Sequence, residues 1–201
     1  MDNKLILVNE EDEEIGYCKK MNAHINEYLH RAFSLFIYNK TDNKLLIHKR
    51  ALGKYHSGGL WTNSCCSHPR YGENLIDSVI RRTKEELGLD INSYIDNLRE
   101  VGKFHYYKKF TDCAENEIDH VFMLTIYKQP MLDVDPDEID DIQWKNINEI
   151  VQELEENPDQ FTAWFPQAFE LFVSTLKHGV VYNTVVNQYI ETIKTSRRHT
   201  L

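Results

Sequence analysis

The chain has 201 residues, of which 41% are hydrophobic and 27% are charged, which is typical of a globular protein with one hydrophobic core. Its formal net charge of −9 argues against a nucleic-acid partner, because phosphate backbones require a basic surface. No stretch approaches the roughly 20 apolar residues of a membrane-spanning helix, and the N-terminus lacks the pattern of a targeting signal. The four cysteines have no even framework spacing, so we expect a cytoplasmic protein without a membrane partner.

Strands are predicted first along the chain, followed by one helix. Residues 40–43, KTDN, are turn-prone and separate two apolar runs, so these runs are expected to form a hairpin. The helix is expected over residues 74–88, because its apolar residues recur near helical spacing, Asn74 is a good N-cap and Gly88 is a stop signal. The predicted strands before this helix cover residues 4–8, 30–39 and 43–50.

The remainder of the chain changes from strands to helices. Strands followed by helices, with one helix embedded among the strands, indicate an α+β fold, in which a mixed β-sheet lies between helical layers. We expect one domain over residues 1–201, sheet-rich to about residue 146 and helical from about residue 147. The further elements are strands over residues 99–110, 118–128 and 139–147 and helices over residues 148–158, 164–179 and 185–198.

Residues 60–69, LWTNSCCSHP, contain two adjacent cysteines, the second of them two residues before His68. A disulfide between Cys65 and Cys66 is disfavoured, because the ring that it would close is strained. Buried packing, metal ligation and a reactive thiol are the remaining uses of such a pair. The residues of this stretch alone leave the three uses open.

The embedded helix and the loop before it resemble the Nudix box, G-x5-E-x7-R-E-U-x-E-E-x-G-U, in which U is apolar. Residues 82 and 86 share one helix face, and in a Nudix hydrolase both are carboxylates whose metal ions activate water. Here Arg82 offers a guanidinium fork to phosphate oxygens beside Glu86, which favours holding a diphosphate without cleaving it. Glu73, Arg81, Glu85, Glu86, Gly88 and Leu89 match the box, whereas Ser67, Arg82 and Thr83 depart from it.

Five motifs together resemble the type I isopentenyl-diphosphate isomerases. They are WTNSCCSHP, HRAFS, RRTKEELG, ENEIDH and FTAWF, and they cover the chain from about Lys20 to Trp164. The resemblance implies a Nudix-like fold and a 1,3-allylic proton shift that interconverts isopentenyl and dimethylallyl diphosphate for isoprenoid biosynthesis. Such an enzyme needs an acid, a base and a shield for positive charge, with water excluded.

The resemblance also implies the catalytic residues. Cys66 matches the family's active cysteine, and a thiol in an apolar pocket stays protonated and available as an acid. Cys65 matches a variable position and is interpreted as packing. Glu117 matches the carboxylate that faces the cysteine across the substrate, and Trp164 matches the family's tryptophan. Tyr106 matches a tyrosine beside that glutamate, although Tyr107 is close enough to compete.

Two kinds of metal ion are implied. Glu115 and Glu117 point to the same side of a strand, because strand side chains alternate. With the histidines at the family's positions they form a set suited to Zn²⁺ or Mn²⁺. Mg²⁺, which prefers oxygen ligands, is expected on Glu86 and the Cys66 carbonyl, together with the diphosphate. The histidines are His24, His30 and His68, and the basic residues matching the family's diphosphate contacts are Lys20, Arg50, Lys54 and Arg82.

Two other hypotheses compete with the isomerase. One is a Nudix hydrolase of a nucleoside or isoprenoid diphosphate, against which Arg82 argues. The other is a zinc-stabilised binding module without catalysis, which gives Cys66 and Trp164 no role. The sequence leaves open which metal the histidines bind, whether Cys66 or Glu117 donates the proton in a given direction, and the oligomeric state.

Overall fold

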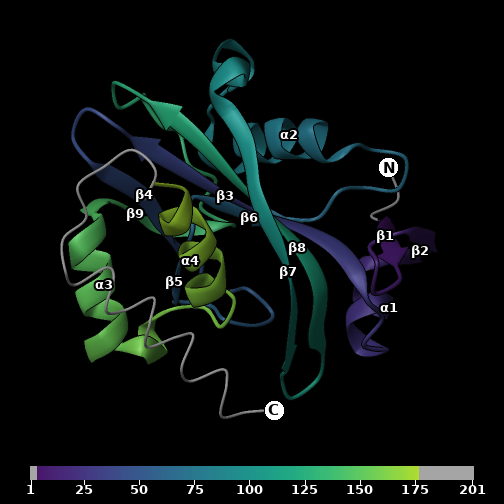
Figure 1. The fold of residues 1–201 in the computed structure, drawn as a ribbon. Coiled ribbons are helices and arrows are strands. Elements are labelled where there is room, and N and C mark those ends of the chain that lie inside the picture. The colour runs from purple at the N-terminus through teal and green to yellow at the C-terminus, as the bar shows by residue number, and fades with distance from the viewer. Residues whose placement is uncertain (1–3, 177–201) are drawn as a thin grey trace.

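The computed structural model describes residues 4–176, and its centre is a twisted mixed β-sheet (Figure 1). The helices are α1 (Lys20–Ile25), α2 (Leu75–Leu87), α3 (Ile147–Glu156) and α4 (Phe165–Leu176), with 3₁₀ turns at Asn92–Asn97 and Pro158–Gln160. The strands are β1 (Lys4–Val8), β2 (Glu14–Lys19), β3 (His30–Asn39), β4 (Lys44–Arg50), β5 (Trp61–Thr62), β6 (Cys65–Ser67), β7 (Leu98–Lys109), β8 (Ala114–Ile126) and β9 (Ile139–Asn146).

Strand β3 organises the sheet, because four strands pair with it. It runs parallel to β8 from the pair His30↔Glu117 onward, and antiparallel to β6 at Ser34↔Cys66. Further along it forms the predicted hairpin with β4, and at its start it meets β1. β7 and β9 extend the sheet beyond β8 and β4. Cys66 and Glu117 are therefore carried by strands on either side of β3.

The side chains of β3 alternate between two hydrophobic cores. Leu35 and Ile37 face α2, where they pack with Val79 and Leu87. Phe36 and Tyr38 face the opposite side and pack with α3 and α4, and the ring of Phe36 lies 5.0 Å from that of Phe172. The predicted arrangement, a mixed sheet between helical layers with helices at its C-terminal end, is confirmed (Figure 1).

The embedded helix begins and ends where its capping residues predict. The side chain of Asn74 accepts a hydrogen bond from the Asp77 amide at 2.8 Å, which satisfies one of the free N–H groups of the first turn. Gly88 has a φ of +65° and its amide donates to the Lys84 carbonyl, as a left-handed C-cap does.

Other elements differ from the sequence predictions. β2 and α1 were not predicted, because their side chains are mostly exposed and carry no apolar periodicity. β8 begins at Ala114, earlier than the predicted residue 118, since its polar first residues pair with β7. The predicted helix over residues 185–198 lies outside the described residues. Within residues 4–176 the helices are too short or too polar to cross a membrane.

We predict that Gly88→Ala lowers the free energy of unfolding more than Gly72→Ala. Both glycines have positive φ values, +65° and +80°, so each alanine costs about 1 kcal/mol or more in backbone strain. A Cβ at Gly88 would also lie 2.6 Å from the Asp133 carbonyl oxygen, whereas nothing lies within 4 Å at Gly72. Overpacking should bring the cost at Gly88 to about 3 kcal/mol. Denaturant unfolding measures the free energy of unfolding of both variants. Equal losses would show that the contact with the Asp133 carbonyl oxygen adds no cost.

Candidate active site

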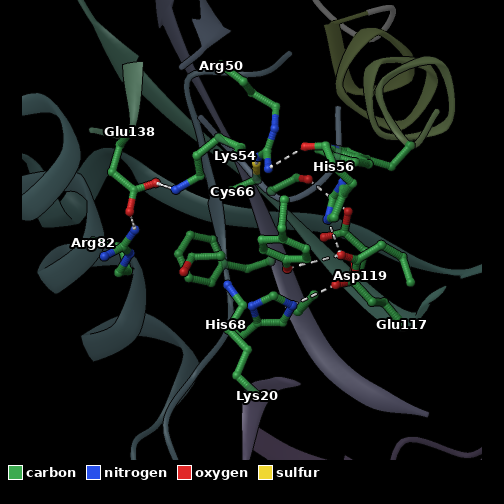
Figure 2. A pocket seen from close by; sticks show the side chains of 17 residues that line it. Lys20, Arg50, Lys54, His56, Cys66, His68, Arg82, Glu117, Asp119 and Glu138 are labelled. Carbon is green, nitrogen blue, oxygen red and sulfur yellow. Dashed lines mark hydrogen bonds and ion pairs between the residues drawn. The ribbon is translucent and has the colours of Figure 1, made fainter. Parts of the chain in front are cut away.

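A pocket beside the first half of β3 gathers most of the predicted site residues (Figure 2). β6 and β8 supply its two flanks, and the loop between β4 and β5 closes over it. Three predicted residues, His24, His30 and Tyr106, are buried close to its wall. The predicted residues that line it directly are Lys20, Arg50, Lys54, Cys66, His68, Arg82, Glu115, Glu117 and Trp164.

Five side chains converge at one end of this pocket as the predicted metal site. Their candidate ligand atoms all lie within 4.8 Å of one another. α1 supplies one of them, the start of β3 the second, the segment after β6 the third, and β8 the two carboxylates. Such a mixture of imidazole and carboxylate suits a divalent ion. The five are His24, His30, His68, Glu115 and Glu117.

Several polar atoms of this cluster are buried without a hydrogen bond, although Nε2 of His24 lies 3.3 Å from Glu115 Oε1 and Nε2 of His30 lies 3.5 Å from Glu117 Oε1. Among the described residues, nothing forms a hydrogen bond with either ring nitrogen of His24, with Nε2 of His30 or with Oε2 of Glu115. The His30 Nδ1–H donates to the Tyr28 carbonyl at 2.7 Å, which leaves the Nε2 lone pair directed at the cluster. Unpaired buried polar atoms cost free energy, and a divalent ion would take up these lone pairs.

Burial sets the protonation of the cluster. It lowers the pKa of His30 to about 4 and that of His68 well below its usual value, so both rings are neutral, which is the ligand form. Burial, and next the neighbouring Glu115 carboxylate, raise the pKa of Glu117 well above its usual value. The Oε1 atom of Glu117 also forms a hydrogen bond with Nε2 of His68 at 2.6 Å. Positive charge at this point would stabilise the carboxylate form of Glu117.

The two adjacent cysteines have different environments, because strand side chains alternate. Cys66 lines the pocket, and burial raises the pKa of its thiol to about 12 although Arg50 opposes the shift. The Arg50 guanidinium lies 3.9 Å from its sulfur. Cys65 is fully buried in the core on the α2 side and its thiol donates to Glu86 at 3.3 Å. Cys65 therefore packs as predicted and also contacts the Nudix-box helix.

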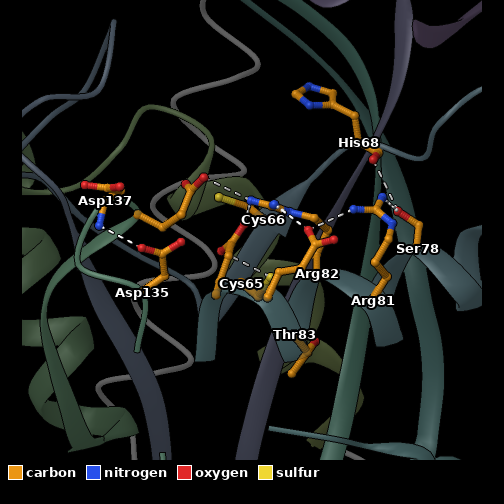
Figure 3. A network of polar contacts seen from close by, with 12 residues as sticks. Cys65, Cys66, His68, Ser78, Arg81, Arg82, Thr83, Asp135 and Asp137 are labelled. Carbon is orange, nitrogen blue, oxygen red and sulfur yellow. Dashed lines mark hydrogen bonds and ion pairs between the residues drawn. The ribbon is translucent and has the colours of Figure 1, made fainter. Parts of the chain in front are cut away.

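The Nudix-box residues lie in the loop before α2, on α2 and just after it, and Figure 3 shows Arg81, Arg82 and Thr83 on the helix. Arg81 binds both oxygens of Glu73, at 2.6 and 2.8 Å, and so fixes the loop to the helix. Arg82 reaches the pocket, where it pairs with Glu86 and lies 3.3 Å from Glu138. Glu86 is buried beneath Arg82, outside both the pocket wall and the cluster of five.

Tyr106 and Tyr107 lie on opposite sides of β7. Tyr106 is 4% exposed and its ring centre is 6.0 Å from that of Trp164. Its hydroxyl has no hydrogen-bond partner within residues 4–176. Tyr107 is 50% exposed and donates to Glu27 at the surface. The geometry favours Tyr106 as the tyrosine beside the site.

Four ionisable residues of the pocket were not predicted from the sequence: Tyr55, His56, Asp119 and Glu138. Asp119 could have been found, because it continues the alternation of Glu115 and Glu117 along one side of β8. Burial raises its pKa to about 7 in spite of the hydrogen bond from Ser34. The other three come from loops or strand ends, where no periodicity marks them.

The fold and the α2 motif define a Nudix protein. A sequence model of the NUDIX domain matches residues 28–165. The crystal structure of DR0079 from Deinococcus radiodurans superposes with a TM-score of 0.63 at 20% identity, over 77% of this chain and 90% of that chain. The MutT protein from Methanosarcina mazei Go1 gives a TM-score of 0.58 at 18% identity, over 74% and 96%. These structures share the fold.

Curated relatives identify the family within the Nudix proteins to which the chain belongs. Isopentenyl-diphosphate Delta-isomerase 2 of Aromatoleum aromaticum is 38% identical over 175 residues, 87% of this chain and 88% of the relative. Isopentenyl-diphosphate Delta-isomerase 2 of Photorhabdus laumondii is 42% identical over 166 residues, 82% and 89%. The chain belongs to the isopentenyl-diphosphate Delta-isomerase family, as its motifs predicted.

We predict that His68→Ala loses a tightly bound divalent metal and that Glu86→Gln keeps it, because only His68 belongs to the cluster of five. Loss of a direct ligand should weaken binding by more than the roughly 10- to 100-fold expected for an outer partner. Metal analysis of the purified proteins after dialysis measures this, with the exposed His105→Ala as control. If the purified Glu86→Gln protein lacks the tightly bound metal, the prediction of two separate metal sites is wrong.

Proposed function

We propose that the protein interconverts isopentenyl diphosphate and dimethylallyl diphosphate by a 1,3-allylic proton shift, for isoprenoid biosynthesis. The observation that carries the proposal is the placement of Cys66 and Glu117 in one buried pocket of a chain from this family. The terminal =CH2 group of the substrate gains a proton and becomes a methyl group, and the neighbouring methylene loses one. Two protonic groups in one pocket are what this exchange requires.

Cys66 and Glu117 act as the acid and base pair. A thiol with a pKa near 12 keeps its proton at neutral pH and is available as the acid that adds a proton to the terminal alkene carbon, which leaves positive charge at the branched carbon. Glu117 exchanges the other proton from the opposite flank of β3. A Zn²⁺ or Mn²⁺ ion bound at the cluster would supply positive charge that holds Glu117 and Glu115 in place. Burial excludes water that would trap a cationic intermediate.

The basic residues at the other end of the pocket bind the diphosphate. Arg82 and Lys54 both pair with Glu138, and a diphosphate replaces this carboxylate as their anionic partner. Lys20 and Arg50 complete the set at the pocket wall. Forked guanidinium groups suit phosphate oxygens. Glu86 and the Cys66 carbonyl would hold the Mg²⁺ that accompanies the diphosphate, since Mg²⁺ prefers oxygen ligands.

A Nudix hydrolase is the alternative function, and Arg82 disfavours it. Hydrolases of this class need clustered carboxylates on the helix to hold the ions that activate water. Here Arg82 replaces one carboxylate and pairs with Glu86. A non-catalytic zinc module would use the cluster of five but would leave Cys66 and Trp164 without a role.

Proton NMR of isopentenyl diphosphate with protein and Mg²⁺ in deuterated water tests the proposal. We predict decay of the vinyl signal, new methyl signals of the dimethylallyl isomer and deuterium in the carbon chain. Cys66→Ala should abolish this conversion while diphosphate binding persists, because the thiol is the proton donor or acceptor. Cys65→Ala, the matched control, should cost only stability. Release of inorganic phosphate without isomerisation would support the hydrolase, and loss of activity in the Cys65 variant alone would reverse the assignment.

We predict that Trp164→Phe slows turnover about tenfold and that Trp164→Leu slows it more. Trp164 is 5% exposed, lines the pocket and lies 5.4 Å from the Arg50 guanidinium carbon, so its face already contacts positive charge. An indole face stabilises a desolvated cation by about 2 kcal/mol, and about 1.4 kcal/mol corresponds to tenfold in rate. Substrate affinity should hardly change, because the positive charge develops only near the transition state.

Turnover and melting temperature of the two variants separate this role from packing. If Trp164 only fills space, leucine and phenylalanine will give similar rates and the damage will be in the melting temperature. Equal rates for the two variants would therefore exclude cation stabilisation.

A further inference from the structure

His56 lies in the loop between β4 and β5, at residues 51–60, and no motif of the sequence gives it a role. Its side chain is buried, at 8% exposure for the residue, and it lines the same pocket as Cys66 and Trp164 (Figure 2). It is not one of the five residues whose ligand atoms converge. It lies just outside that cluster and contacts it.

The contact is a hydrogen bond to Glu115. The His56 Nε2 atom faces Glu115 Oε1, and because an ionised carboxylate only accepts, Nε2 carries the hydrogen. The other ring nitrogen, Nδ1, lies 3.1 Å from the Ser57 hydroxyl. The Tyr55 hydroxyl adds a longer contact to the same Glu115 oxygen, at 3.4 Å.

These contacts distinguish the two oxygens of Glu115. Oε1 accepts from His56 and Tyr55 and also lies 3.3 Å from Nε2 of His24. Oε2 is buried and, within residues 4–176, has no hydrogen-bond partner. His56 therefore fixes the rotation of the carboxylate: Oε1 is held by His56 beside Nε2 of His24, and Oε2 is left without a hydrogen bond for a cation.

The His56 ring is itself held on several sides. It stacks on Phe110 with a centroid distance of 4.6 Å and an interplanar angle of 20°. Its edge contacts with Tyr55 and Trp164 have centroid distances of 4.5 and 6.0 Å. The backbone carbonyl of His56 accepts from Arg50 at 3.5 Å. A ring packed in this way has little freedom to turn, which a residue that orients another requires.

We propose that His56 is a positioning residue of the metal site, which orients Glu115 so that the carboxylate binds the divalent ion through one oxygen. The inference rests on the proposed function only in that the ion is the one expected at the cluster of five. Hydrogen-bonded partners outside the direct ligands typically affect metal affinity by about 10- to 100-fold. His56 also joins the cluster to Trp164 through its packed ring.

Two substitutions separate the hydrogen bond from the packing. His56→Gln places an amide N–H near the position of Nε2 and removes the ring, whereas His56→Phe keeps a ring against Phe110 and removes the donor. We expect Phe to weaken binding of Mn²⁺ and of Zn²⁺ by about 10- to 100-fold and Gln to stay within about threefold of the parent. Chelator competition with each metal alone, on the full chain without substrate, measures the affinities.

The exposed His105→Phe is the control for loss of a histidine away from the site and should bind metal like the parent. Parent-like metal affinity in His56→Phe would overturn the proposal, and so would equal weakening in the Gln and Phe variants. If the Phe variant does not fold, His56→Asn replaces it, because its shorter amide cannot reach Glu115. The readout is metal affinity, so a protein without isomerase activity would refute the proposed function and leave this test decisive.

Discussion

The parallel hydrogen bonding between β3 and β8 sets the position of the whole site. Its register begins at His30↔Glu117, which places one histidine beside one carboxylate of the cluster. On the other side of β3, the register Ser34↔Cys66 fixes the thiol. A slip of one residue in either pairing would turn Glu117 or Cys66 toward the opposite side of the sheet. The two hydrophobic cores that sandwich the sheet resist such a slip, because it would turn the apolar side chains fitted to each core into the other one.

Burial of so many polar groups lowers the free energy of unfolding, and the same burial sets the protonation states on which their chemistry depends. Cys66 keeps its proton because its thiolate would be poorly solvated, and His30 stays neutral for the same reason. The ionised form of Glu117 is unfavourable in this buried position unless a positive charge lies nearby. A divalent ion at the cluster would offset that cost, so metal binding, stability and the protonation of Glu117 are coupled.

The sequence predicted what periodicity and local capping encode. Asn74 and Gly88 bound the helix as expected, and alternation placed Glu115 with Glu117. The resemblance to known motifs added His24, His30 and Arg50, which no local pattern would select.

Contacts that depend on loop conformation were not predictable in this way. His56 reaches Glu115 only because the loop after β4 folds back over β8. Glu138 forms ion pairs with Lys54 and Arg82, both of which are far from it in the sequence. Such pairings are decided by tertiary packing, and neither the spacing nor the type of these residues distinguishes them from surface charges.

The α2 helix carries the departure from the Nudix box on which the proposed retention of a diphosphate depends. Arg81 and Glu73 keep the structural ion pair of the motif, so the loop and helix have the shape of a Nudix box. At position 82 the motif's carboxylate is replaced by a guanidinium, which pairs with Glu86 and faces the pocket. This change removes negative charge where the metal ions of a hydrolase would activate water, and it adds positive charge where, in the proposed function, phosphate oxygens would bind. In the proposed function the proton exchange takes place at the other end of the pocket, where Cys66 and Glu117 lie on the flanks of β3.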